Sequence, residues 1–343
     1  MSDLKATVQP IDGQPISPPG TSEPLGLALI WAYTLPRIGF GIMGLLFSTY
    51  LMKYATDVLL IAPAAMGTVL AISRIWDGVS DPLVGYLSDR TRSRLGRRRS
   101  WLFLSAVPIA IGLVMIWSPP QLLSGWSLIA WMVLALLVYE TASTAFFIPH
   151  GALGVELTPD YHERTRLFGY SHMFTAVGAV LGLIALYLMN EAGDKREFAL
   201  WLTVIAGSCI AALIIYSTFI VPERSEYQGR GSESMFGSFL GVWRNIHARL
   251  LLIVYGIETF GAAVIGMLVP YLIAYVIPET DMGMSKSAYM IAILLTYTVP
   301  QFIFTPLWIR LARRIGKKRL WAISMFSAAV ILSAISSQFI IFT

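Results

Sequence analysis

Long apolar runs alternate with short polar segments along nearly the whole chain. Nine of these runs approach or exceed the length, about 20 residues, that a helix needs to cross the hydrocarbon core of a bilayer. We therefore predict nine membrane-spanning helices. Their expected bounds are residues 25–54, 64–87, 100–117, 126–154, 167–189, 199–221, 250–277, 288–311 and 320–342.

The overall composition supports the same class of protein. Of the 343 residues, 56% are hydrophobic and 13% are charged, whereas soluble domains carry about 25% charged residues. The predicted fold class is therefore an all-α integral membrane protein. The N-terminus has no basic segment followed by a short apolar one, so we expect no cleavable signal peptide.

Basic residues are concentrated in the loops that follow even-numbered predicted helices. Lys+Arg 25 against Asp+Glu 20 gives a net charge of +5. This distribution follows the positive-inside rule rather than a nucleic-acid-binding face, so we expect these loops and the N-terminus in the cytoplasm. The two densest clusters are Arg90, Arg92, Arg94, Arg97, Arg98 and Arg99 after the second helix, and Arg310, Arg313, Arg314, Lys317, Lys318 and Arg319 after the eighth.

Six predicted helices separate these two basic clusters, an offset typical of two parallel six-helix repeats. We expect a disordered cytoplasmic tail (1–24), an N-terminal six-helix bundle (25–221), a cytoplasmic linker (222–249) and a partial C-terminal bundle of three helices (250–343). The second half is incomplete in this pattern. We expect either a truncated chain or a gene product without the last three helices.

The second predicted helix carries charges in the middle of an apolar run. Arg74, Asp77 and Asp81 are spaced i, i+3 and i+7, so on a helix they share one face. Carboxylates at this depth are costly and usually line a bundle interior or a water-filled path. The residues predict either a cation or proton site, or a structural ion pair with Arg74 or Arg37.

A longer motif surrounds these carboxylates. Residues 85–90, GYLSDR, with the arginine cluster that follows, resemble the signature between helices two and three of the major facilitator superfamily. Residues 74–82, RIWDGVSDP, closely resemble the glycoside–pentoside–hexuronide:cation symporter family. The resemblance covers residues 25–343. It implies a non-enzymatic, multi-pass transporter of the plasma (inner) membrane that couples a small solute to Na⁺ or H⁺ and needs no other cofactor.

The resemblance also implies a cation site. The two cation-binding aspartates of that family match Asp77 and Asp81, and polar neighbours match Ser80 and Thr144. Oxygen ligands of this kind suit a hard monovalent cation, and paired carboxylates could instead hold a proton. A cytoplasmic latch is implied in addition, and the basic loop would serve as a topological anchor either way. The latch residues are Gly85, Asp89, Arg90, Arg97 and Arg98.

The solute is less defined than the cation. Sugar-contacting positions of the family fall at Gly41, Phe147 and about His172, and residues 139–153 are as similar to the lysophospholipid-transporting branch. The solute is therefore a sugar or glycoside, or an amphiphile; a truncated, non-transporting membrane protein is the third interpretation. Candidates for contact with the solute are Arg37, Glu140, His150, His172 and Glu258.

Each of these candidates has a structural alternative. Arg37 could pair with an acid and hold helices together, and a lone histidine in a membrane helix is more often a hydrogen-bonded packing residue.

Gly178 and Gly182 have the small-xxx-small spacing that lets two membrane helices approach closely. No nucleophile elbow, Walker loop, Rossmann fingerprint or zinc-ligand spacing occurs in the sequence, which argues against an ATPase or hydrolase.

Overall fold

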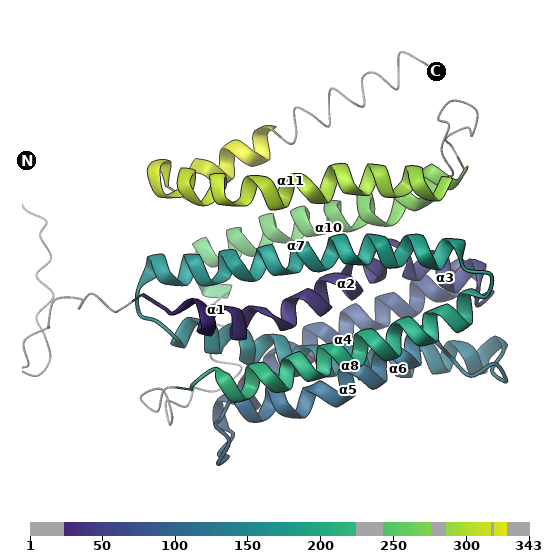
Figure 1. The fold of residues 1–343 in the computed structure, drawn as a ribbon, viewed down its shortest axis with the longest axis horizontal. Helices are drawn as coiled ribbons and strands as arrows, with labels where there is room; N and C mark the ends of the chain where they lie inside the picture. Colours follow the sequence, from purple (N-terminus) through teal and green to yellow (C-terminus); the bar gives the residue numbers. More distant parts are fainter. Residues whose placement is uncertain (1–23, 224–242, 276–285, 317–318, 328–343) are drawn as a thin grey trace, which may run out of the picture.

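A computed structural model describes residues 24–223, 243–275, 286–316 and 319–327, and these are largely helical (Figure 1). The predicted tail therefore lies, except for residue 24, outside the described residues, as do most of the predicted linker and the end of the ninth predicted helix. Residues 319–327 are helical, in agreement with the start of that ninth helix. The all-α prediction is confirmed.

The first apolar run is broken where we expected one helix over residues 25–54. It forms α1 (Leu27–Thr34), α2 (Pro36–Thr49) and α3 (Leu51–Asp57). Pro36 has no backbone N–H and begins α2 at its first position, where that donor is not needed. α1 and α2 together still form one candidate membrane span, Leu27–Thr49, so the predicted spanning segment is present, and its division into three helices was not predicted.

The next helices follow the predicted order with shifted ends. They are α4 (Pro63–Arg90), α5 (Arg99–Trp117), α6 (Gly125–Glu156), α7 (Tyr161–Glu191), α8 (Lys195–Ile220), α10 (Ile246–Tyr275) and α11 (Lys286–Ile315). α7 begins six residues before the predicted residue 167 because Asp160 caps it. The Asp160 carboxylate accepts backbone N–H bonds from His162 and Glu163 at 2.6 and 2.9 Å, and these bonds, chiefly that of Glu163, hold its pKa below the usual range. α10 begins at Ile246, four residues before the predicted start at residue 250.

Five described helical segments are long and apolar enough to cross a membrane. α4 is not one of them, although it has 28 residues, and its charged side chains lower its apolar character. The chain is accordingly a multi-pass membrane protein. The five segments are Leu27–Thr49, Arg99–Trp117, Gly125–Glu156, Tyr161–Glu191 and Lys195–Ile220.

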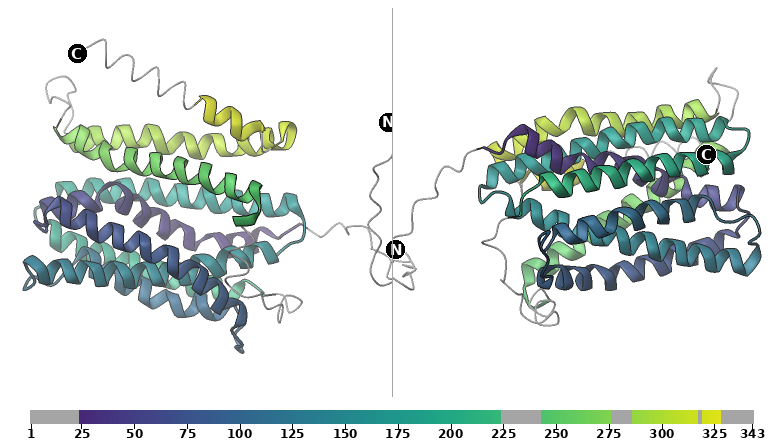
Figure 2. Two further views of the ribbon diagram at one scale, coloured as in Figure 1. Left: turned by 180° about the vertical axis from the view of Figure 1, so that it is seen from behind. Right: turned by 60° about the horizontal axis from the view of Figure 1, so that its bottom comes forward.

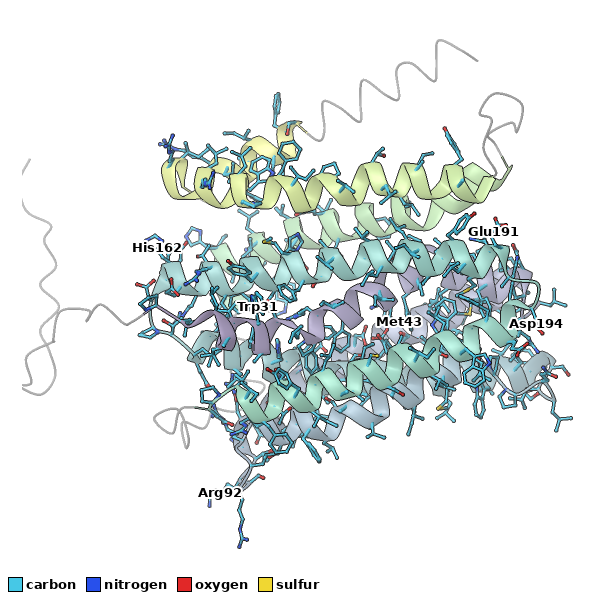
Figure 3. All side chains as sticks on the ribbon, in the orientation of Figure 1. Trp31, Met43, Arg92, His162, Glu191 and Asp194 are labelled. Atoms are coloured by element: carbon cyan, nitrogen blue, oxygen red, sulfur yellow. The ribbon has the colours of Figure 1, made fainter. Side chains whose placement is uncertain are left out.

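The helices lie side by side with their axes roughly aligned (Figures 1 and 2). α2 packs along α7, α5 packs against both α6 and α8, α4 packs on α6, and α11 packs on α7. Arg92, in the loop before α5, and His162, in the first turn of α7, lie at one end of the molecule (Figure 3). Glu191, the last residue of α7, and Asp194, just before α8, lie at the opposite end, as expected for helices that alternate in direction.

Glycines bring α2 and α7 into close contact, which confirms the prediction for Gly178 and Gly182. A Cβ atom on Gly178 would overlap the Ile38 carbonyl oxygen, and one on Gly182 would lie 2.8 Å from the Ile42 carbonyl oxygen. Backbone atoms, unlike the ends of long side chains, cannot easily move away. This contact fixes α2 against α7 and so fixes the position of Arg37, which lies on α2.

Candidate functional site

The carboxylates of α4 line a cavity of about 280 Å³ between α4 and α6. The spacing that predicted one face for Arg74, Asp77 and Asp81 is confirmed, because all three border this cavity. Glu140 of α6 lines it as well, so three carboxyl groups face one guanidinium. The full lining is Arg74, Asp77, Asp81, Tyr139, Glu140, Ser143, Thr144, Phe147 and Ile148.

Arg74 forms ion pairs with two of the three carboxyl groups that line the cavity. Its Nη1 lies 3.0 Å from Asp77 Oδ2 and its Nη2 lies 3.5 Å from Glu140 Oε1. The Arg74 side chain is 68% exposed, so this ion pair is only partly shielded from solvent. The ion pair with Arg74 that we considered for Asp77 is therefore present, and the pair with Arg37 is absent from the described contacts.

Thr144 links α6 to the second aspartate. Its hydroxyl donates to Asp81 Oδ1 at 2.9 Å, and its Oγ1 lies 3.5 Å from the Ser80 hydroxyl. Ser80 is buried and is not among the residues that line the cavity. Thr144 thus orients the Asp81 carboxylate, and Ser80 contacts Thr144 from outside the cavity lining.

One oxygen of this site has no partner among the described residues. Asp77 Oδ1 is buried and accepts no hydrogen bond there, although a buried carboxylate oxygen normally has one. With Arg74 paired to Asp77 and Glu140, the cavity still carries an excess of carboxyl groups. Carboxylate and hydroxyl oxygens in this arrangement fit a hard cation or a proton.

Glu140, a predicted candidate for solute contact, lies in the same cavity as Asp77 and Asp81. It accepts a hydrogen bond from Ser73 at 3.4 Å and pairs with Arg74. The signal was available, because Glu140 precedes Thr144 by four residues and therefore lies on the same face of α6.

The other candidates for solute contact are dispersed. His150 is fully buried, its Nε2 lies 2.9 Å from the Tyr33 carbonyl oxygen, and its ring stacks on Tyr33, an environment that matches the packing alternative. His172 on α7 and Glu258 on α10 are exposed and do not line the cavity. Arg37 is partly buried against Phe147, a residue of the cavity wall.

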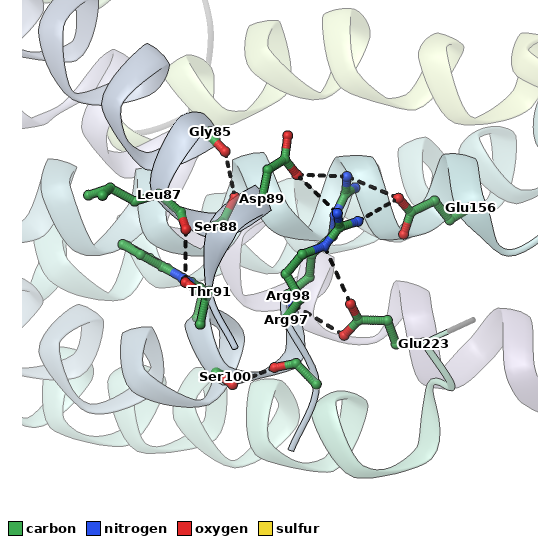
Figure 4. A network of polar contacts seen from close by, with 12 residues as sticks. Gly85, Leu87, Ser88, Asp89, Thr91, Arg97, Arg98, Ser100, Glu156 and Glu223 are labelled. Carbon is green, nitrogen blue, oxygen red and sulfur yellow. Dashed lines mark hydrogen bonds and ion pairs between the residues drawn. The ribbon is translucent and has the colours of Figure 1, made fainter. Parts of the chain in front are cut away.

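A second polar network gathers part of the expected latch where α4, α6 and α8 end (Figure 4). Arg97 Nη2 lies 2.9 Å from Glu156 Oε1, and Arg98 Nη2 lies 3.1 Å from Asp89 Oδ1 and 3.0 Å from Glu156 Oε1. Glu223 accepts the Arg98 backbone N–H at 3.1 Å. Asp89, Arg97 and Arg98 were expected here, but their partners Glu156 and Glu223 were not.

The remaining latch residues lie at the edge of this network. The Arg90 guanidinium stacks over the Tyr86 ring at 4.1 Å, and the Gly85 carbonyl accepts the Ser88 hydroxyl at 3.0 Å. Gly96 has a φ of +117°, and a Cβ there would overlap the Glu223 carboxylate. The loop can therefore turn and admit Glu223 only because residue 96 is glycine.

No group of three or more His, Cys, Asp or Glu side chains in the described ranges is arranged to hold a metal ion.

Residues 32–337 match the family described as MFS/sugar transport protein, and the chain belongs to this family. A Synechocystis protein named "Uncharacterized symporter sll1374" is 36% identical over 203 residues, covering 57% of this chain and 37% of that protein. A Danio rerio protein named "Sodium-dependent lysophosphatidylcholine symporter 1-A" is 29% identical over 157 residues, covering 45% of this chain and 29% of that protein.

A solved structure has the same fold. The proton:xylose symporter XylE of the major facilitator superfamily, bound to 6-bromo-6-deoxy-D-glucose, matches with a TM-score of 0.55 and 18% identity. The match covers 85% of this chain and 70% of that chain. The predicted major-facilitator fold is confirmed. This chain aligns with well under two thirds of the length of the two curated relatives above.

Proposed function

We propose that the protein is a secondary active transporter in which a small cation, Na⁺ or H⁺, drives the movement of a small solute. The observation that carries this proposal is the cavity between α4 and α6, where Asp77, Asp81 and Glu140 face one arginine and Asp77 Oδ1 lacks a partner among the described residues. Family membership supports it. Asp77, Asp81 and Thr144 would hold the cation, with Ser80 supporting Thr144.

Binding of the cation would change the net charge of the cavity between α4 and α6. A cation or proton in the cavity reduces the repulsion among the three carboxyl groups and lowers the cost of enclosing them in apolar surroundings. The two bundles, 25–221 and 250–343, would then rock about a solute bound between them, joined by the linker 222–249. The arginine-rich end would face the cytoplasm, with the N-terminus on that side of the plasma (inner) membrane.

Thermal unfolding of the purified protein tests the cation site. If Na⁺ binds the folded state, stability rises as RT ln(1 + [Na⁺]/Kd), about 2.7 kcal/mol at 100 times Kd. We expect a larger rise in melting temperature in NaCl than in KCl, lost in Asp77→Asn and in Asp81→Asn. Asp57→Asn is the matched control, because Asp57 pairs with Lys53 on α3, away from the cavity.

The cation itself is decided by the same experiment. The coupling cation is a proton if sodium does not change the melting temperature but pH does. This pH dependence should then be lost in Asp77→Asn and in Asp81→Asn. If folded Asp77→Asn and Asp81→Asn keep the full wild-type response to sodium and to pH, the proposal is contradicted.

A second candidate solute is an amphiphile rather than a sugar. An apolar cavity of about 430 Å³ lies between α5 and α6, lined by residues that include Trp101, Pro108, Leu137 and Ala145, and one relative is named for lysophosphatidylcholine. Stabilisation by lysophosphatidylcholine, lost when Ala145→Phe fills the cavity and kept in the exposed-surface control Ala130→Phe, would favour this solute. Stabilisation by sugars alone would favour the first.

A further inference from the structure

Arg37 of α2 lies against aromatic rings rather than against an acid. Its guanidinium carbon is 4.9 Å from the centre of the Phe147 ring, and the side chain is partly buried. The neighbouring Tyr33 hydroxyl donates to the His150 carbonyl oxygen at 3.0 Å and is a hydrogen-bond partner of the Arg37 side chain. The cation–π contact and this neutral hydroxyl orient the guanidinium but leave its positive charge uncompensated.

No described carboxylate forms an ion pair with Arg37, and its buried Nε has no hydrogen-bond acceptor in the described part of the chain. Arginine cannot lose its proton in a protein, so the charge persists. Arg74, by contrast, pairs with Asp77 and Glu140. An uncompensated guanidinium inside a membrane bundle is costly and is usually retained for a function.

Phe147 separates this guanidinium from the acidic cavity. One residue carries Arg37 on its ring and also lines the cavity of Asp77 and Asp81. A positive and a negative site therefore flank the same side chain of α6. The acidic cavity suits a cation, and the Arg37 side is the complementary place for an anion.

We propose that Arg37 binds an anionic group, a carboxylate or a phosphate, of the transported solute. This rests on the proposed transport function and names the chemistry of its solute. The planar guanidinium fork offers two parallel N–H donors that match either oxyanion, and partial burial excludes enough water to strengthen the contact. A neutral sugar would leave the Arg37 charge unpaired.

The competing explanation is a structural pair with an acid of another helix. Glu258 on α10 is the carboxylate to consider, because α10 packs against α2 and Glu258 is exposed. The ligand-free stability of Arg37→Gln separates the two. We expect its melting temperature to equal or exceed that of the wild type, whereas Arg97→Gln, which breaks the buried pair with Glu156, lowers it. A fall in Arg37→Gln that Glu258→Gln suppresses would overturn the proposal.

Binding is tested with defined probes in thermal unfolding at fixed sodium. Glucuronate against glucose tests a carboxylate on a sugar, and hexyl phosphate against hexanol tests a phosphate on an apolar chain. We expect one anionic probe to raise the melting temperature more than its neutral counterpart. The difference should vanish in Arg37→Gln, persist in part in Arg37→Lys, and be unchanged in the exposed-loop control Arg92→Gln.

The proposal is overturned if neutral and anionic probes stabilise equally, if no anionic probe stabilises the protein, or if Arg37→Gln keeps the full difference. A separate measurement shows whether the cation site binds sodium. The sodium response of Asp77→Asn and Asp81→Asn reports on the transport proposal, and the anion response of Arg37→Gln reports on this one.

Discussion

Thr144 connects Asp81 to the second helix of the candidate cation site. Its hydroxyl donates to Asp81 of α4 from within α6, and Ser80 contacts the same oxygen. A hydrogen bond to a charged group contributes about 1.5–3 kcal/mol. Thr144 therefore sets the orientation of the Asp81 carboxylate more than any other described neighbour, because no other hydrogen bond or ion pair to Asp81 is found among the described residues.

We predict that Thr144→Val weakens cation binding about 10- to 100-fold, since that loss of 1.5–3 kcal/mol corresponds to one to two factors of ten. Thr144→Ser keeps the hydroxyl and should remain close to wild type. The sodium concentration that gives half of the thermal stabilisation measures the change. Thr68→Val, on the exposed face of α4, controls for the loss of a threonine hydroxyl. Equal affinities for Thr144→Val and wild type would remove Thr144 from the site.

At the scale of elements, the contact between α2 and α7 supports the position of Arg37. Gly178 faces the Ile38 carbonyl oxygen across this contact. The glycine lets the two backbones approach, and Ile38 is the residue directly after Arg37. A shift of α7 away from α2 would therefore move the guanidinium relative to Phe147 on α6.

We predict that Gly178→Ala lowers the free energy of unfolding by about 1–3 kcal/mol, the usual cost of overpacking. Gly44→Ala on α2 is the matched control, because nothing lies within 4 Å of its Cβ position and alanine favours the helix by about 1 kcal/mol. Melting temperatures of both variants in the same detergent measure the difference. A Gly178→Ala protein as stable as Gly44→Ala would show that the helices separate without cost.

At the scale of the whole molecule, local patterns predicted the features that depend on neighbouring residues. Apolar runs predicted the helices, and the i, i+3, i+7 spacing predicted the shared face of Arg74, Asp77 and Asp81. The break before Pro36 was missed although proline marks it. Glu223 could not be assigned, because it meets Arg98 from 125 positions along the chain and only the packing of α8 brings it there.

The contact of Glu223 belongs to a charged network whose stability depends on how the helices of the bundle pack. This network joins the end of α4 and the loop after it to the ends of α6 and α8. Its members are Asp89, Arg97, Arg98, Glu156 and Glu223. Arg97 and Glu223 are nearly fully buried, with side chains 6% and 3% exposed. Removing one member leaves a buried charge without its partner, which typically costs about 3–5 kcal/mol.

We predict that Glu156→Gln and Glu223→Gln each lower the melting temperature, and that the combination with Arg97→Gln costs less than the sum of the single changes, because the unpaired charge is then removed. Asp57→Asn breaks the exposed pair with Lys53 on α3 and should change stability by about 0.3–0.5 kcal/mol at most. A double-mutant cycle in thermal unfolding measures the coupling. Additive effects at Arg97 and Glu156 would mean that the loop is held by its backbone turn at Gly96 and not by these charges.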